Sequence, residues 1–121
     1  MTSLSELGTF LGGLRVAVTV ADETYRIVFM NDLALEHYAA QGGENLIGTD
    51  LLDCHNAESQ ATLRHVYDRY RAGDLAPTRY RIAKKDGRIQ SIVLIPLIVD
   101  GQFKGIAELL WTEHPDLVFD K

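Results

Sequence analysis

The apolar positions near the N-terminus follow a helical period, whereas several later segments alternate as strands do. The first leucines recur at steps of three and four residues: Leu4, Leu7, Leu11 and Leu14. This spacing forms one stripe on a helix, which a capping box of Ser3 and Glu6 begins and two glycines at positions 12–13 end. Because so short a helix is marginal alone, we expect the stripe to pack either on the protein's own sheet or on a second copy of the chain.

The next segment predicts a strand hairpin followed by short helices. Residues 15–20 alternate and are rich in valine, and with residues 25–30 they predict an antiparallel pair around a polar turn at 21–24. Asn31 or Asp32 follows directly as the N-cap of a helix that the glycines at 42–43 stop. A short helical turn is expected at residues 45–48.

The longest helix is predicted from Asn56, its N-cap, to Gly73, with a short polar loop before it. The apolar positions form one narrow face: Leu63, Val66, Tyr67 and Tyr70. His65 falls about 150° from the centre of that face, so we expect it to point toward water. Thr62 is expected at the edge of the inner face.

Three further strands are predicted at residues 78–82, 89–99 and 104–111. Asp-Gly pairs stand in both turns between them, which is a strong hairpin signal. Both faces of residues 92–99 are apolar apart from Pro96, whereas a sheet with one face in water alternates. We therefore expect the second face to be covered, by the N-terminal helix or by a partner. Pro96 indicates an edge, an irregularity or a position that needs no amide hydrogen bond.

Composition and charge narrow the class of protein. The 121 residues suffice for one domain with a core. No apolar run approaches the roughly 20 residues that cross a bilayer, and the start carries no secretion signal. The single cysteine favours a reducing, cytoplasmic setting. The net charge of −5 argues against nucleic acid as a direct partner, and we interpret the basic stretch from Arg64 to Arg88 as solvated surface.

Several short motifs, in this order and spacing, resemble those of the PAS domain family. Each motif alone is weak, but together they cover residues 14–113. They are Asn31 directly after the second strand, Asn45-Leu46-Ile47-Gly48 as the family's "eLiG" turn, Asp53-Cys54-His55-Asn56 where many members have an Asp-His-Pro-like loop, Tyr70-Arg71-Ala72-Gly73 at the end of the long helix, Lys84-Lys85-Asp86-Gly87 as one hairpin, and Asp100-Gly101 through Gly105 as the last.

This resemblance implies an α+β fold, with a five-stranded antiparallel sheet, helices on one face and an N-terminal amphipathic capping helix. It divides the chain into the helix at 1–13, a sensor domain at 14–113 and a tail or connector at 114–121. The family senses small molecules, light or redox state, and often dimerises through an N-terminal helix. The leucine stripe (Leu4, Leu7, Leu11 and Leu14) suits that dimer interface.

Two cofactors known in the family can be tested against the sequence. The flavin-binding LOV subclass needs Gly-x-Asn-Cys, but Cys54 stands six residues after Gly48, so the flavin-adduct cysteine is missing and flavin is not expected. Heme-binding members use a histidine of the long helix. The corresponding position here holds Thr62, and His65 stands one turn later on the outer side. Heme therefore stays open only through His65 or His55.

The sequence offers little other site chemistry. Cys54 and His55 are adjacent, yet no second pair of metal ligands stands at a suitable spacing, so we interpret them as part of the loop that caps the long helix. There is no Gly-rich phosphate loop, no nucleophile elbow and no recognisable pair of carboxylates on one face. The sequence therefore does not indicate an enzyme.

Two functions fit these observations. The first is a sensor that binds a small, mostly apolar ligand between the long helix and the sheet, and that passes the signal through dimerisation or partner contacts. The second is a ligand-free interaction or dimerisation module with a filled core. In both cases the expected partners are a second copy of the chain and an effector protein or an output domain in a longer chain. The candidate ligand-binding residues are Met30, Tyr38, Thr62, Leu63, Val66, Tyr67, Tyr80, Val93 and Trp111.

Overall fold

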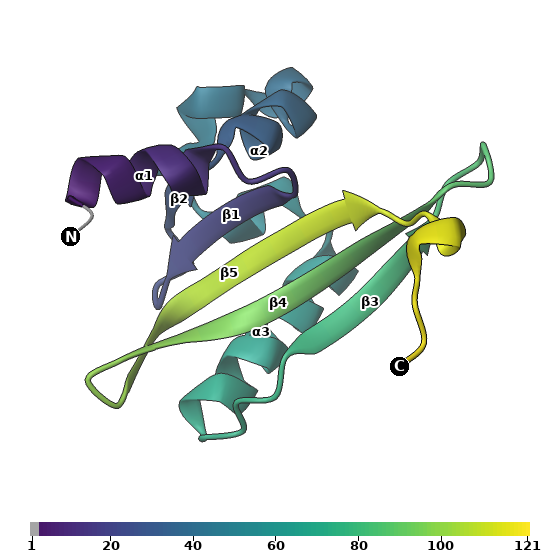
Figure 1. Cartoon of the computed structure of the whole chain (residues 1–121). Coiled ribbons are helices and arrows are strands. Elements are labelled where there is room, and N and C mark those ends of the chain that lie inside the picture. Colours follow the sequence, from purple (N-terminus) through teal and green to yellow (C-terminus); the bar gives the residue numbers. More distant parts are fainter. Residues whose placement is uncertain (1–2) are drawn as a thin grey trace.

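The computed structural model describes residues 3–121, and these form one five-stranded antiparallel sheet with short and long helices around it (Figure 1). The strands lie in the order β2-β1-β5-β4-β3, so the N-terminal hairpin joins the C-terminal meander through β1 and β5. The strands are β1 Ala17–Asp22, β2 Ile27–Met30, β3 Thr78–Ala83, β4 Ile89–Val99 and β5 Gln102–Thr112. The predicted α+β fold with five antiparallel strands is confirmed.

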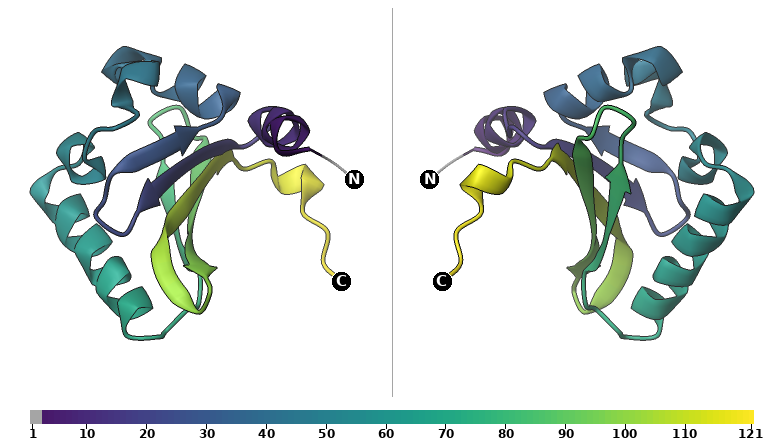
Figure 2. Two further views of the ribbon diagram at one scale, coloured as in Figure 1. Left: turned by 90° about the vertical axis from the view of Figure 1, so that its left-hand side faces the viewer. Right: turned by 90° about the vertical axis from the view of Figure 1, so that its right-hand side faces the viewer.

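The helices divide between the two faces of the sheet. Figure 2 shows α2 and α3 on one face, whereas α1 and the C-terminal end lie on the other. The helices are α1 Leu4–Gly12, α2 Asp32–His37 and α3 Ala57–Arg71, with short 3-10 turns η1 Ala39–Gln41, η2 Gly43–Leu46, η3 Leu51–Cys54 and η4 Pro115–Leu117. None of the helices in the described part is long and apolar enough to cross a membrane.

The face of the sheet toward α3 carries most of the core. Leu63, Val66, Tyr67 and Tyr70 of α3 are buried as predicted. The Tyr67 hydroxyl donates to the Asp22 carbonyl oxygen at 2.8 Å, and the Tyr70 hydroxyl donates to the Leu94 carbonyl oxygen at 2.9 Å. These two bonds attach one helix to backbone groups at distant places in the sheet.

Aromatic rings fill the space under the C-terminal half of α3. The Tyr25 and Tyr67 rings stack with centroids 4.1 Å apart, and Phe103 meets Tyr67 edge-on at 5.4 Å. The Arg71 guanidinium lies within 5.8 Å of the centroids of Tyr25, Tyr67 and Phe103, and also donates to the Glu23 carbonyl oxygen. The space under the C-terminal half of α3 is therefore filled by packed aromatic side chains.

Asn31 connects α2 to β1 and to the segment that precedes β1. It is 1% exposed, and its side-chain oxygen accepts from the amides of Val18 and Ala34. Its side-chain amide donates to the carbonyl oxygens of Leu14 and Val16. The predicted N-cap is thus confirmed, and the same side chain also ties α2 to β1 and to the segment that leads out of α1.

The face of the sheet opposite α3 is only partly covered. Leu11 and Leu14 lie over Val18, Val20 and Phe29, with an apolar gap of about 270 Å³ between them. Leu4 at the start of α1 is 88% exposed. The N-terminal helix therefore covers part of this face, as one of the two sequence alternatives expected, and leaves the rest of the leucine stripe in solvent.

Pro96 and Gly105 occupy special positions in the meander. Pairing between β3 and β4 ends at Leu94, so β4 has an unpaired edge by the time it reaches Pro96. Gly105 has φ +142° and lies so close to Ala21 that an added Cβ would overlap the Ala21 carbonyl oxygen. Glycine at this point lets β5 approach β1 at backbone distance.

Replacing Asn31 by alanine should lower the free energy of unfolding by about 3 kcal/mol or more, because it removes the cap and leaves several buried backbone groups unpaired. Asn56→Ala is the matched control. Asn56 also caps a helix, but it is exposed and accepts a single bond from Ser59, so about 1 kcal/mol is expected. Denaturant unfolding measures both values. Equal losses would show that the buried bonds of Asn31 add nothing to its cap.

Gly105→Ala should lower the free energy of unfolding by about 3 kcal/mol, because the new methyl group meets rigid backbone. Gly87→Ala is its control: Gly87 also has positive φ (+88°), but nothing lies within 4 Å of the added Cβ. We expect about 1 kcal/mol there, from the backbone conformation alone. Thermal unfolding of both variants and of the parent protein measures the two losses in stability. Similar losses would contradict a steric role for Gly105.

Candidate functional site

A cavity of about 100 Å³ lies between the inner side of β1, β2 and β5 and the short helices that precede α3. We call it the Glu108 cavity. It is lined by Thr19, Ile27, Met30, Tyr38, Gln41, Leu46, Leu51, Cys54, His55 and Glu108. No residue of α3 lies in this set, so the expectation of a pocket between the long helix and the sheet is wrong for this cavity. Aromatic side chains occupy the region under α3, and the cavity lies beside the short helices instead.

Glu108 gives the cavity its chemical character. It stands in β5 between Ile106 and Leu110, both buried, and is itself 6% exposed. In the register of the sheet it faces Thr19 of β1 and Leu94 of β4. A carboxylate in the middle of an apolar strand face is costly to bury unless it is paired or hydrogen-bonded, so its surroundings decide whether it is tolerated.

Tyr38 is the residue that holds this carboxylate. It ends α2 as its C-cap, and its hydroxyl donates to Glu108 Oε1 at 2.9 Å. Burial, together with the neighbouring Glu108, raises the pKa of the Tyr38 phenol well above its ordinary value. The phenol therefore keeps its proton and remains the donor. Burial and Glu108 also raise the pKa of Tyr80, to about 12.

The loop from Asp50 to Asn56 forms the far wall and is fixed by its own hydrogen bonds. Asp50 caps η3 by accepting from the Leu52 amide. Gln60 of α3 donates to the carbonyl oxygens of Leu52 and His55. The His55 ring nitrogen Nδ1 lies 2.8 Å from the Leu51 carbonyl oxygen, which can only accept. These contacts confirm the predicted capping loop and hold His55 at the cavity.

Cys54 also lines the cavity and is partly exposed to solvent. Burial of the thiol, with Asp53 and Asp50 nearby, raises its pKa. A raised pKa keeps the thiol protonated and unreactive at neutral pH, because the thiolate is the nucleophile and metal ligand. Cys54 is therefore a wall residue here and has none of the features of a reactive cysteine.

The structure brings two of the predicted ligand-binding residues, Met30 and Tyr38, to the Glu108 cavity. Leu63, Val66 and Tyr67 are buried in the core beside it, and Tyr80 is half-buried against the same core. The assignment of Thr62 to the inner face was wrong. Its side chain is exposed and bonds back to the Glu58 carbonyl oxygen, one turn earlier in α3.

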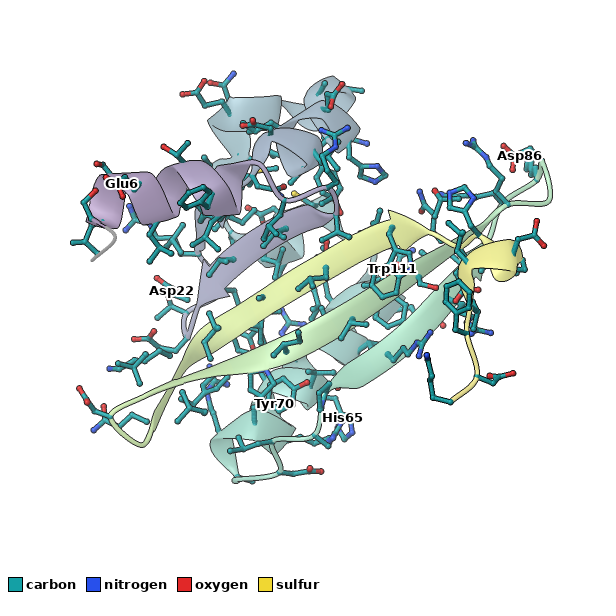
Figure 3. The ribbon with its side chains drawn as sticks, viewed as in Figure 1. Glu6, Asp22, His65, Tyr70, Asp86 and Trp111 are labelled. Carbon is teal, nitrogen blue, oxygen red and sulfur yellow. The ribbon has the colours of Figure 1, made fainter. Side chains whose placement is uncertain are left out.

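Val93 and Trp111 lie on the opposite face of the sheet. Their neighbours in sequence, Ile92 and Leu110, belong to the buried core, and successive strand side chains point to opposite faces. Trp111 lies on the face turned away from α3 (Figure 3). It lines an open groove of about 780 Å³, together with Arg15, His37, His114 and others. These two candidates therefore do not reach the Glu108 cavity.

Sequence reasoning missed six of the lining residues: Thr19, Ile27, Gln41, Leu46, Leu51 and Glu108. One signal was present for Glu108. It is the only charged residue of the run from Gly105 to Trp111, in a strand that the meander pattern already predicted. A charge inside an otherwise apolar strand indicates either an exposed edge or a buried site, and β5 is a central strand.

The residues present do not fit heme. The cavity is far smaller than the roughly 300–1,000 Å³ typical of cofactor sites. His65 is exposed, as expected, and lies on α3, which does not line the cavity (Figure 3). His55 lines it. Its hydrogen bond to the Leu51 carbonyl oxygen takes up only Nδ1, so the case against heme rests on the size of the cavity. No group of three His, Cys, Asp or Glu side chains in residues 3–121 is arranged to hold a metal ion.

The basic stretch between Arg64 and Arg88 forms ordinary surface ion pairs. Five of its eight cationic side chains have acidic partners within 4.0 Å: Arg69, Arg71, Arg79, Arg81 and Arg88. Exposed pairs of this kind contribute little to stability. Arg79 and Arg81 share Glu113, so four carboxylates take part in these pairs and balance half of the eight positive charges of the stretch.

No protein-family model matches the sequence, and no curated protein is significantly similar to it. Solved structures do match the fold. The PAS domain of BvgS from Bordetella pertussis is 18% identical, with a TM-score of 0.67, and the match covers 94% of this chain and 90% of that one.

Two further structures match over similar lengths. A sensory box sensor histidine kinase from Vibrio cholerae has a TM-score of 0.65 at 19% identity, covering 89% of this chain and 90% of its own. A C-terminal domain from Streptococcus mutans has a TM-score of 0.74 at 15% identity, covering 89% and 83%. With its strand order and helix placement, this chain therefore adopts the fold of PAS domains, as its sequence motifs predicted.

Proposed function

We propose that this chain is a signal-sensing module that binds a small ligand in the Glu108 cavity. The observation that carries the proposal is a buried carboxylate, held by Tyr38, on the wall of an internal space. A core built only for stability would place an apolar residue there. Structures with this fold include domains of sensor histidine kinases, which supports a sensory role and a module without catalytic activity of its own.

The structure changes the expected nature of the ligand. Sequence analysis predicted a mostly apolar molecule, and the cavity does have apolar walls such as Met30 and Leu51. However, Thr19, Tyr38 and Glu108 add polar groups on one side. A volume of about 100 Å³ is also below the roughly 150 Å³ of an engineered cavity that holds benzene. The group that lies inside the cavity is therefore expected to be smaller than benzene and to have a polar end.

A ligand-free interaction module is the second candidate, and the exposed leucines favour it. Leu4 is 88% exposed, and Phe10 on the same helix is 68% exposed. We propose that α1 forms a homodimer interface with its leucine stripe.

An effector protein, or an output domain in a longer chain, would then receive the signal. The expected setting is cytoplasmic, which the single reduced cysteine supports.

Native mass spectrometry of gently purified protein should show a small mass excess that disappears in Thr19→Leu. The bulkier apolar side chain would take up cavity volume and remove a polar wall group. Thr62→Leu is the matched control, because Thr62 is exposed on α3 and should leave the excess unchanged. An unliganded mass with a stable dimer would instead favour the interaction module. An excess that persists in Thr19→Leu would place the ligand elsewhere.

The double variant Leu4→Glu/Leu7→Glu should be monomeric under conditions where the parent is a dimer, because two charges would be buried in the apolar contact. Light scattering after size exclusion measures the mass. Leu117→Glu/Val118→Glu is the control, since these residues are 67% and 65% exposed near the other terminus. A monomeric parent, or a control that dissociates equally, would contradict an interface on α1.

A further inference from the structure

The Glu108 carboxylate is buried without a positive charge to balance it. Tyr38 is its one hydrogen-bond partner within residues 3–121. No lysine, arginine or histidine nitrogen of this part of the chain forms an ion pair with it. A phenol proton satisfies part of one oxygen but leaves the net charge in place. Such a charge inside a protein is costly until a proton or a cation neutralises it.

The second carboxylate oxygen is the one that a bound molecule would meet. Oε1 accepts from the Tyr38 hydroxyl, and Oε2 accepts from no group in the described residues. The Ser91 hydroxyl is fully buried and has no hydrogen-bond partner, whereas Oε2 is not fully buried. Since Glu108 lines the cavity, this oxygen is the acceptor that remains for a molecule bound there. The Thr19 hydroxyl and the Tyr38 ring stand at the same wall.

The other titratable groups of the cavity do not supply the missing charge. The pKa of the Cys54 thiol is raised by burial and by nearby carboxylates, which keeps it neutral. The Tyr38 phenol is also held neutral. His55 directs its Nδ1 to the Leu51 carbonyl oxygen and forms no ion pair with Glu108. The cavity therefore presents acceptors and a negative charge to whatever enters it.

The volume of the cavity favours a compact group beside this charge. About 100 Å³ is less than the roughly 150 Å³ of a cavity that holds benzene, although the exposed wall residues Gln41 and Cys54 leave the cavity partly open. The group next to Glu108 is therefore expected to be smaller than benzene. Ammonium and amidinium ions are of this size, and their N–H groups form strong, charge-assisted bonds to a carboxylate.

We propose that Glu108 is the specificity-determining residue of the cavity and selects a small organic cation, an ammonium or amidinium, whose N–H groups bind its free oxygen. This inference rests on the proposed ligand-binding function and names the chemical class of the ligand. Tyr38 is a positioning residue. It fixes the carboxylate through Oε1 and leaves Oε2 as the free acceptor.

Acetamidinium and acetamide form a matched pair of probes, because they have nearly the same shape and differ in charge. In a titration followed by amide NMR spectra, acetamidinium chloride should shift the signals of Thr19, Tyr38 and Glu108 to saturation. Acetamide should bind at least about tenfold more weakly, as expected when a charged hydrogen bond is replaced by a neutral one. Sodium chloride at equal concentration controls for salt.

Glu108→Gln keeps the shape of the side chain and an oxygen for Tyr38, but removes the charge. It should lower acetamidinium affinity by about tenfold or more. Glu58→Gln removes the same charge from an exposed position on α3 and should bind as the parent does. If Glu108→Gln fails to fold, the comparison of the two probes on the parent protein still decides.

Three results overturn the inference: no saturable shift with acetamidinium, equal binding of acetamide, or unchanged affinity in Glu108→Gln. These results are distinct from failure of the sensor function. If acetamidinium fails in one of these ways while Thr19→Leu still removes a mass excess, the cavity remains a ligand site and only the inference of a small organic cation is rejected. The absence of both probe binding and mass excess would reject the two proposals together.

Discussion

Asn31 is buried where the end of β2, the start of α2 and the first residues of β1 meet, and its four hydrogen bonds fix all three. The consequence reaches the cavity. Asn31 caps the start of α2, and this six-residue helix ends at its C-cap, Tyr38. Tyr38 donates to Glu108 across the cavity. One short helix thus links the buried amide of Asn31 to the phenol that holds the buried carboxylate.

The aromatic core explains why the space lies beside the short helices. Tyr25, Tyr67 and Phe103 pack ring against ring under α3, and Tyr70 bonds to the backbone of β4. These rings occupy the space between the C-terminal half of α3 and the sheet. The opposite end is covered by the six-residue helix α2 and by turns of three or four residues. The cavity lies where the covering elements are shortest.

Much of the fold could be read from local signals, because those signals act over a few residues. The Asp-Gly turns, the cap at Asn31 and the apolar face of α3 each depend on neighbours in sequence. The site depends on register instead. Glu108 meets Thr19 only because β1 pairs with β5, and no spacing in the sequence shows that pairing. The prediction for Thr62 was wrong because the face that α3 buries is narrow, and Thr62 lies just outside it.

The same strands that line the cavity also carry the partly covered outer face. On β1, Thr19 points into the cavity, while Val18 and Val20 face Leu11 and Leu14 of the N-terminal segment. A ligand can shift the arrangement of α1 only if it binds one arrangement more tightly than another. Because β1 contacts the cavity with one face and the N-terminal segment with the other, a ligand in the cavity and the position of α1 can influence each other through this strand. The apolar gap under α1 meets a second condition, because a tightly packed helix would have no alternative position to adopt.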